Sequence, residues 1–133
     1  MAVLLDTHLW AWWSLGDGRL KARERDALDR LAARHELRLC AISLWEAQMA
    51  AAKGRLRLLD PFEAWLRAAA APEVVEIVPI DVRVALALND LPASLPNDPA
   101  DRLIVAAARA YALPLATHDS VIRRSRAVRL WRP

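Results

Sequence analysis

Short apolar runs alternate along the chain with longer segments in which apolar residues recur at helical spacing. Continuous apolar or β-branched runs of this length are typical of strands that are buried on both faces. The runs that predict strands are Ala2–Leu5, Leu37–Ile42, Val74–Ile80, Leu115–Thr117 and Val128–Trp131. The segments that predict helices are Leu20–Leu37, Ser43–Lys53, a helix that opens at Asp60-Pro61, Val82–Leu91, Pro99–Tyr111 and a short turn over Val121–Arg126. This alternation predicts an α/β fold with a mainly parallel central sheet.

One proline-rich segment interrupts this alternation. Leu91–Pro99 contains three prolines and is predicted to be a loop. The chain shows no internal repeat, linker or low-complexity block, and 133 residues are the usual size of one domain. We therefore expect a single domain that spans residues 1–133.

Acidic side chains follow several of the predicted strands. Asp6 comes directly after the first strand, Glu46 lies early in the helix after the second, and Asp119 follows the fourth. Asp98 and Asp101 flank the start of the helix that precedes the fourth strand. Ligands of open α/β sheets bind at the carboxyl ends of the strands, where these carboxylates are expected to gather. Gathered carboxylates repel one another unless a hard cation neutralises them, which predicts a Mg²⁺ or Mn²⁺ site.

Each acidic residue also has a structural interpretation. Ser43 to Glu46 has the spacing of a capping box, and Asp98, Asp101 and Asp119 each lie where a helix begins. Asp6 is the exception, because a carboxylate at the end of a buried strand is costly unless it is paired. Asp81 also follows a strand, and we interpret it as a helix cap and not as a ligand.

Composition indicates in which cellular compartment the protein acts. Cys40 is the only cysteine, so the chain cannot form an internal disulfide. No basic N-terminal region precedes a long apolar run, and we expect a cytoplasmic protein without a membrane-spanning segment. The net charge is +3, and nearly all basic residues are arginines, whose planar fork suits phosphate. This charge is compatible with a nucleic-acid substrate, and it is equally compatible with an ordinary solvated surface.

Other kinds of chemistry have less support. The histidines His8, His35 and His118 do not have zinc spacing with a cysteine. Ser43 lacks the context of a nucleophile elbow. Gly16 and Gly18 are not followed by the Gly-Lys-Ser/Thr sequence of a phosphate-binding loop.

Four segments together resemble the successive motifs of PIN-domain nucleases, in particular the VapC-type toxins of prokaryotic type II toxin–antitoxin systems. They are Leu4–His8, Ser43–Glu46, Asp98–Arg102 and Thr117–Asp119, and the closing Val128–Trp131 is also similar. The motifs occur in the order of the family and span nearly the whole chain. The resemblance implies an α/β/α sandwich, Mg²⁺- or Mn²⁺-dependent cleavage of RNA, and inhibition by a cognate VapB-type antitoxin.

The resemblance also assigns roles to residues. It implies a catalytic quartet with two metal ligands, Asp6 and Asp101, completed by Glu46 and Asp119. Further site residues are implied at Asp98, which matches an additional acidic position, and at Thr7 and Thr117, which match small polar residues near the metal. This chain departs from the family at Asn97, Ala100 and Ala50, where many relatives have a histidine, an aromatic residue and a lysine. Lys53 is a candidate to replace that lysine.

Six tryptophans are many for a chain of this size, and Trp10, Trp12 and Trp13 crowd into one segment. A helix cannot direct all three into one core, because Trp12 and Trp13 would lie about 100° apart around its axis. One of them is therefore either merely exposed or part of an interface, and tryptophan is enriched in interfaces. We favour an interface, either a homodimer or the surface that meets an antitoxin.

Three functions remain open at this point. The first is a toxin endoribonuclease, which the short chain favours. The second is a PIN nuclease that processes RNA without being a toxin. The third is an inactive PIN-like binding module, against which the intact acidic quartet argues.

Overall fold

Four parallel strands form the centre of the computed structural model, which describes residues 1–133. The strands are β1 (Val3–Leu5), β2 (Leu37–Cys40), β3 (Glu76–Val78) and β4 (Leu115–Ala116), in the order β3-β2-β1-β4. β1 lies in the middle, where Leu5 is paired with Leu39 on one side and with Ala116 on the other. All carboxyl ends therefore lie at one edge of the sheet, as the sequence predicts.

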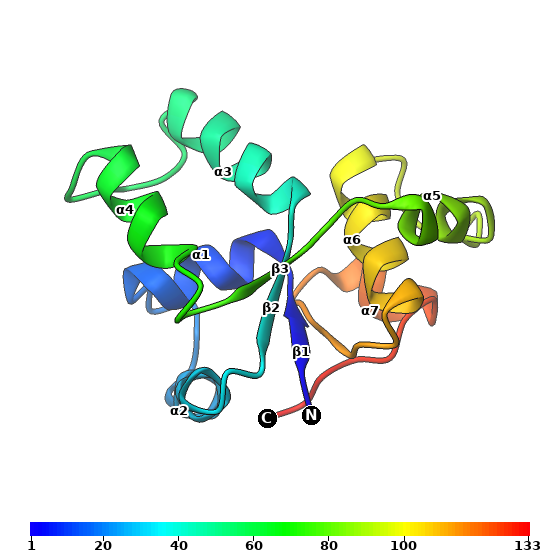
Figure 1. Ribbon diagram of the computed structural model, residues 1–133, viewed down its shortest axis with the longest axis horizontal. Coiled ribbons are helices and arrows are strands. Elements are labelled where there is room, and N and C mark those ends of the chain that lie inside the picture. Colours follow the sequence, from blue (N-terminus) through cyan, green and yellow to red (C-terminus); the bar gives the residue numbers. More distant parts are fainter.

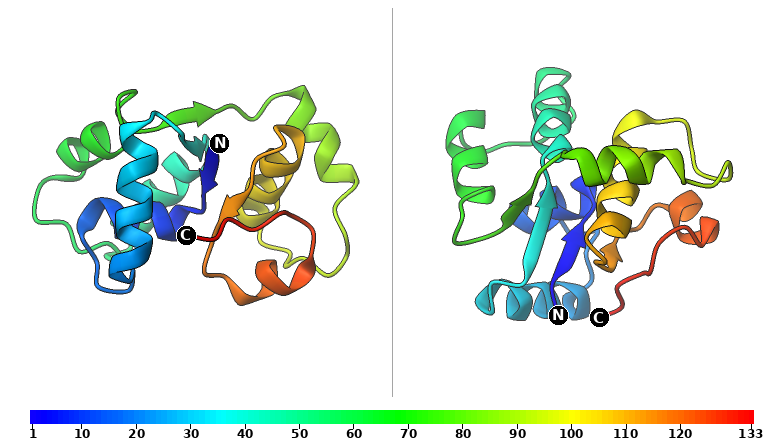
Figure 2. Two further views of the ribbon diagram at one scale, coloured as in Figure 1. Left: turned by 90° about the horizontal axis from the view of Figure 1, so that it is seen from below. Right: turned by 45° about the vertical axis from the view of Figure 1, so that its right-hand side comes forward.

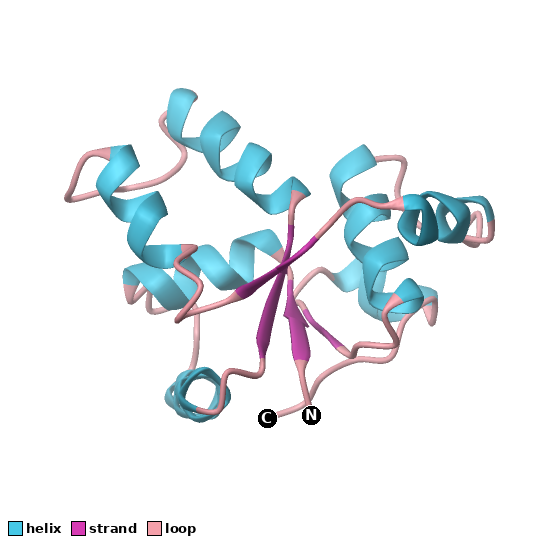
Figure 3. Ribbon diagram, viewed as in Figure 1, coloured by secondary structure: helices cyan, strands magenta, loops and turns pink.

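Helices cover both faces of this sheet (Figures 1 and 3). On one side lie α1 (Thr7–Leu15), α2 (Ala22–Ala33), α3 (Ile42–Ala52) and α4 (Phe62–Ala69). On the other side lie α5 (Val82–Asn89), α6 (Pro99–Ala110) and α7 (Ser120–Ser125). Two further views show the same two helical layers, with both chain ends near the amino edge of the sheet (Figure 2). The α/β fold with a parallel sheet between helices is thereby confirmed.

The side chains of β1 alternate between two apolar clusters, one for each layer. Val3 and Leu5 pack with Leu9, Trp10 and residues of α2 and α4. Leu4 points to the other face, where it packs in the cluster that contains Ile104 of α6 and Ile122 of α7. Because both faces of the strand are buried, its sequence is a continuous apolar run and not an alternating one.

Most predicted elements form, but with shorter bounds. The predicted helix Leu20–Leu37 forms only over Ala22–Ala33, since His35 takes a positive φ of 56° and turns the chain into β2. The predicted strand Val128–Trp131 is wrong as a strand. It contributes a single bridge between Leu130 and Leu115, made by two backbone hydrogen bonds of Leu115. Leu91–Pro99 is a loop, as predicted.

None of the helices is long and apolar enough to cross a membrane.

Replacing Leu4 by alanine should test the two-sided burial of β1. Leu4 is fully buried, so the truncation should lower the free energy of unfolding by about 2–5 kcal/mol through lost burial and a cavity. Leu59→Ala is the matched control, because Leu59 is fully exposed and should change stability by less than about 0.5 kcal/mol. Urea unfolding measures both variants. Equal, small effects would mean that β1 is not the centre of the core.

Candidate functional site

Asp6 lies at the carboxyl end of the central strand and is held on both carboxylate oxygens. Its Oδ1 accepts a hydrogen bond from the backbone N–H of Thr7 at 2.8 Å, and its Oδ2 accepts one from the Thr117 hydroxyl at 2.6 Å. The residue is only 5 % exposed. Asp6 is also the N-cap of α1, so one side chain both starts a helix and forms the floor of the site.

Glu46 reaches the same region from α3. The Thr7 hydroxyl donates a hydrogen bond to Glu46 Oε1 and lies 2.7 Å from the hydroxyl of Ser43. A hydroxyl has one proton to donate, so Ser43 must be the donor to Thr7 in this chain of contacts. The structure contradicts the capping-box interpretation of Ser43 and Glu46. α3 begins at Ile42, which places Ser43 inside the helix, and its N-cap Ala41 has no side-chain cap.

Asp98 and Asp101 have different roles at the start of α6. The Asp98 side chain caps the helix by accepting a hydrogen bond from the backbone N–H of Asp101 at 3.0 Å. Asp98 is therefore the cap, and Asp101 is not. The carboxylate of Asp101, one turn into the helix, is left half-buried without a side-chain hydrogen bond to the protein.

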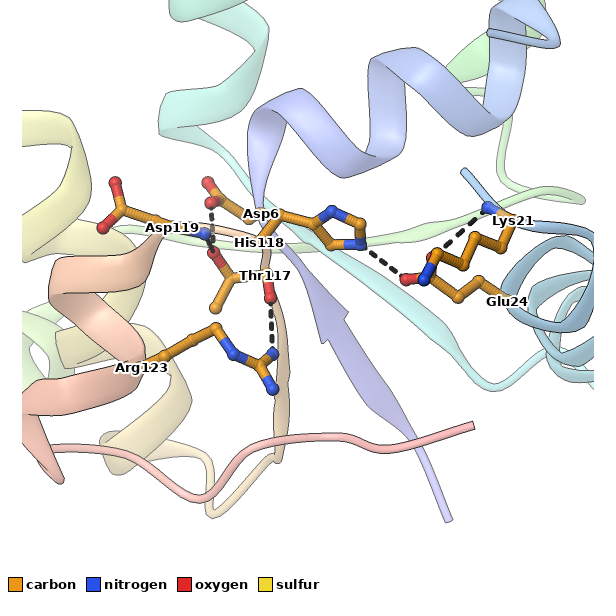
Figure 4. A network of polar contacts seen from close by, with 7 residues as sticks. All are labelled: Asp6, Lys21, Glu24, Thr117, His118, Asp119 and Arg123. Atoms are coloured by element: carbon orange, nitrogen blue, oxygen red, sulfur yellow. Dashed lines mark hydrogen bonds and ion pairs between the residues drawn. The ribbon is translucent and has the colours of Figure 1, made fainter. Parts of the chain in front are cut away.

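Asp119 completes the set at the end of β4 (Figure 4). Its side chain caps α7 by accepting hydrogen bonds from the N–H groups of Val121 and Ile122. Its own N–H donates to the Thr117 hydroxyl at 3.0 Å, and that hydroxyl donates onward to Asp6. Thr117 thus links the two aspartates, and the capping and site interpretations of Asp119 are compatible.

The electrostatics show that these carboxylates crowd one another. Burial raises the pKa of Asp101 to about 7, helped by the negative charges of Asp6, Asp98, Asp119 and Glu46. Burial also raises the pKa of Asp6 and of Glu46, against hydrogen bonds from Thr117 and Thr7 that lower them. Asp101 therefore lies within the field of all four other acids, and the nearby His8 side chain acts in the opposite direction by lowering the pKa of Asp6 and of Glu46.

This donor set suits a hard divalent cation. It consists of oxygen ligands, and it carries more negative charge than its surroundings compensate, which is what Mg²⁺ or Mn²⁺ requires. As they stand, no three carboxylate, imidazole or thiol groups converge closely enough to hold a metal ion. Mg²⁺ usually keeps several of its waters and is held by one or two carboxylates, so a pair of these acids is a sufficient contribution from the protein.

Two hollows flank the carboxylates. One, of about 320 Å³, is lined by Glu46 and Asp98 together with aromatic and basic side chains, among them Trp12, Trp45, Lys53 and Arg55. The other, of about 600 Å³, begins at Thr117 and His118 and extends along the start of α2 and the C-terminal residues. Arg19 lines both hollows, with its guanidinium 5.3 Å from the centre of the Trp12 ring. The predicted substitute Lys53 and the position of the missing lysine, Ala50, both line the smaller hollow.

The prediction that Trp10, Trp12 and Trp13 cannot all pack against one core is wrong, whereas an interface at this segment stays a prediction. Trp10 is fully buried and donates from its indole to the carbonyl of Ala69, while Trp12 and Trp13 are half-buried against the same core. Trp45 is the strongly exposed tryptophan, at 53 %. An exposed tryptophan exists, but it lies on α3 beside the carboxylates and not in the Trp10–Trp13 segment.

Two side-chain contacts at the site were not predicted from the sequence. Ser43 is fully buried and supports Thr7, a role that its spacing of three residues from Glu46, on the same helix face, could have suggested. His118 pairs with Glu24 of α2 across 94 residues of sequence, for which the sequence offers no local signal (Figure 4). Asp81 caps α5, as predicted, and also accepts a hydrogen bond from Tyr111.

Asp101→Asn should change how the stability of the metal-free protein depends on pH. Folding raises the pKa of Asp101 to about 7, so the folded state binds more protons than the unfolded state between about pH 4 and 7. The stability of the wild type should therefore fall as pH rises through this range. In Asp101→Asn this fall should be much smaller, so the variant should be more stable than the wild type at pH 7. Chemical unfolding in EDTA at several pH values measures this. Identical pH profiles for the two proteins would contradict the crowding of charge at Asp101.

Comparisons with known proteins show the family to which the chain belongs. The PIN domain family model matches residues 3–127. A curated relative, "Ribonuclease VapC22" of Mycobacterium tuberculosis, is 39 % identical over 124 residues, which cover 93 % of this chain and 92 % of the relative. Two solved structures share the fold at 18 % identity. The first is VapBC2 from Rickettsia felis bound to a promoter DNA fragment, with a TM-score of 0.76 over 98 % of each chain. The second is DNA-bound VapBC from Salmonella typhimurium, with a TM-score of 0.74 over 98 % of this chain and 97 % of that one. The chain therefore belongs to the PIN domain family, and within it to the VapC-type proteins.

Proposed function

We propose that this protein is a metal-dependent endoribonuclease and the toxin of a type II toxin–antitoxin pair. The observation that carries the proposal is the half-buried carboxylate of Asp101 in the field of four other acids, at the carboxyl edge of a PIN-domain sheet. The 39 % identity to a protein named a ribonuclease supports RNA as the substrate. The identity extends over almost the full length of both chains, which supports a toxin over an RNA-processing nuclease.

We assign the metal to Asp6 and Asp101, with Mg²⁺ or Mn²⁺ as the ion. When bound, such a cation would stabilise negative charge on a phosphoryl oxygen and lower the pKa of a water molecule. Thr117 and the N–H of Thr7 hold Asp6 in a single orientation. Thr7, supported by Ser43, does the same for Glu46, and Asp119 is fixed by its role as the cap of α7. Glu46 and Asp119 complete the field of negative charge around the ion, with Asp98 beside them.

We propose a VapB-type antitoxin as the protein partner, because the two similar structures are named VapBC complexes.

We also propose that the single domain 1–133 acts in the cytoplasm and forms a homodimer. The support for a dimer is an exposed apolar row of Ile80, Val82 and Leu86 on and beside α5, a kind of surface that usually packs against a partner. An inactive binding module is disfavoured, since the acidic quartet is intact and gathered at one sheet edge.

Neutral, isosteric substitutions should separate site acids from structural ones. Asp6→Asn, Glu46→Gln and Asp101→Asn should each lower the rate of RNA cleavage by at least about 100-fold, the scale for losing one preorganised charged group. They should remain folded, because asparagine caps α1 as well as aspartate does and because a neutral side chain at position 46 or 101 relieves repulsion within the cluster. Cleavage of total cellular RNA, with mapping of the new RNA ends, measures activity, and melting temperature measures folding.

Asp81→Asn is the matched control for this series. Asparagine caps a helix as well as aspartate does, and Asp81 lies outside the carboxylate cluster, so this variant should cleave RNA at close to the wild-type rate. EDTA should abolish wild-type cleavage, and Mg²⁺ or Mn²⁺ should restore it. Full activity in EDTA, or in Asp101→Asn, would contradict the proposed site.

A further inference from the structure

The larger of the two hollows is strongly basic. It contains five cationic side chains, contributed by the loop before α2, by α2, by α7 and by the C-terminal residues, and one acidic side chain, Glu24. The cationic residues are Arg19, Lys21, Arg23, Arg123 and Arg132. The net charge of the whole chain is only +3, so positive charge is concentrated in this hollow.

Of these five cations, only Arg19 lies near an acidic side chain, with its guanidinium 3.8 Å from a carboxylate oxygen of Asp17. Glu24, the one acid of the lining, is paired with His118. Arg123 donates to the backbone carbonyl of Thr117 at 2.9 Å, and a neutral carbonyl leaves the cationic charge in place. Lys21 and Arg132 are exposed and form no ion pair with an acidic side chain. The hollow is therefore open to an anionic ligand.

Thr117 links the hollow to the carboxylates. Thr117, part of its wall, donates the hydrogen bond that holds Asp6, and Arg123 binds the carbonyl of the same threonine (Figure 4). An anionic chain that lies in the hollow would thus contact a residue that is itself hydrogen-bonded to Asp6. Guanidinium groups suit phosphate, since their planar donor fork matches its oxygens.

We propose that this hollow binds the phosphates of single-stranded RNA on one side of the bond that is cleaved. The inference rests on the proposed ribonuclease function and adds where the substrate lies. A single strand is favoured over a duplex because Asp6 is only 5 % exposed, and a flexible strand can lower one phosphate to a recessed carboxylate. Positive charge beside the site also offsets the repulsion between the RNA and the acidic cluster.

The test compares two double variants in an Asp6→Asn background, where RNA should stay intact. The test variant, Lys21→Gln with Arg132→Gln, removes two charges from the hollow. The control variant, Arg30→Gln with Arg57→Gln, removes two exposed charges whose side chains line none of the hollows described. Binding of an unstructured oligoribonucleotide is measured by fluorescence anisotropy over a series of KCl concentrations. Each phosphate contact of a single strand contributes about 0.7 to the slope of log K against log salt, so the first variant should lose about 1.4 from that slope.

The control variant should keep the slope, and an RNA duplex of the same sequence should bind more weakly than the single strand. All variants should retain their melting temperature, because the substituted side chains are exposed.

An unchanged slope in the Lys21/Arg132 variant, or no binding of RNA by the Asp6→Asn protein, would overturn the inference. An unchanged slope together with lost binding of the antitoxin would assign the hollow to that protein instead. Wild-type cleavage is measured separately, so a loss of slope without any RNA cleavage would contradict only the proposed function.

Discussion

Repulsion among carboxylates is the constraint on which the site depends. The parallel sheet brings the ends of β1, β2 and β4 to one edge, and the acids that follow them, with those at the start of α6, share one region. Such a cluster weakens the folded state unless a cation neutralises it. The surrounding structure must therefore supply enough stability to hold the acids in place, and two fully packed helical layers provide it.

Helix capping is the means by which most of the acids are fixed. Asp6, Asp98 and Asp119 are the N-caps of α1, α6 and α7, and each accepts hydrogen bonds from backbone N–H groups at the start of its helix. The positive end of a helix also favours a negative charge there, so the caps partly offset the repulsion that the cluster creates. Glu46 is not a cap and is held instead by the Thr7 and Ser43 hydroxyls. A structural role and a site role thus coexist in the same side chains.

The sequence predicts the parallel sheet and the gathering of acids because both follow from local patterns. Apolar runs define the buried strands, and the residue after each strand must lie at the carboxyl edge. The sequence could not decide between cap and ligand for Glu46, since the spacing of Ser43 and Glu46 fits a capping box whether or not the helix starts at Ser43. Burial of the tryptophans also could not be predicted. It depends on how α1 packs against α2 and α4, where Trp13 donates to Asp29 at 2.8 Å and Trp10 to the carbonyl of Ala69 at 3.0 Å.

Metal-induced stabilisation tests the central claim most directly, because it needs neither a known RNA target nor an antitoxin. The measurement is the melting temperature of the metal-free protein as Mn²⁺ is added, for the wild type, Asp101→Asn and Asp81→Asn. A ligand that binds only the folded state stabilises it by about 2.7 kcal/mol at 100 times its Kd. The account predicts a clear, saturating rise for the wild type and for Asp81→Asn, and little or none for Asp101→Asn. The same rise in all three proteins, or no rise in any, would contradict a metal site built on these carboxylates.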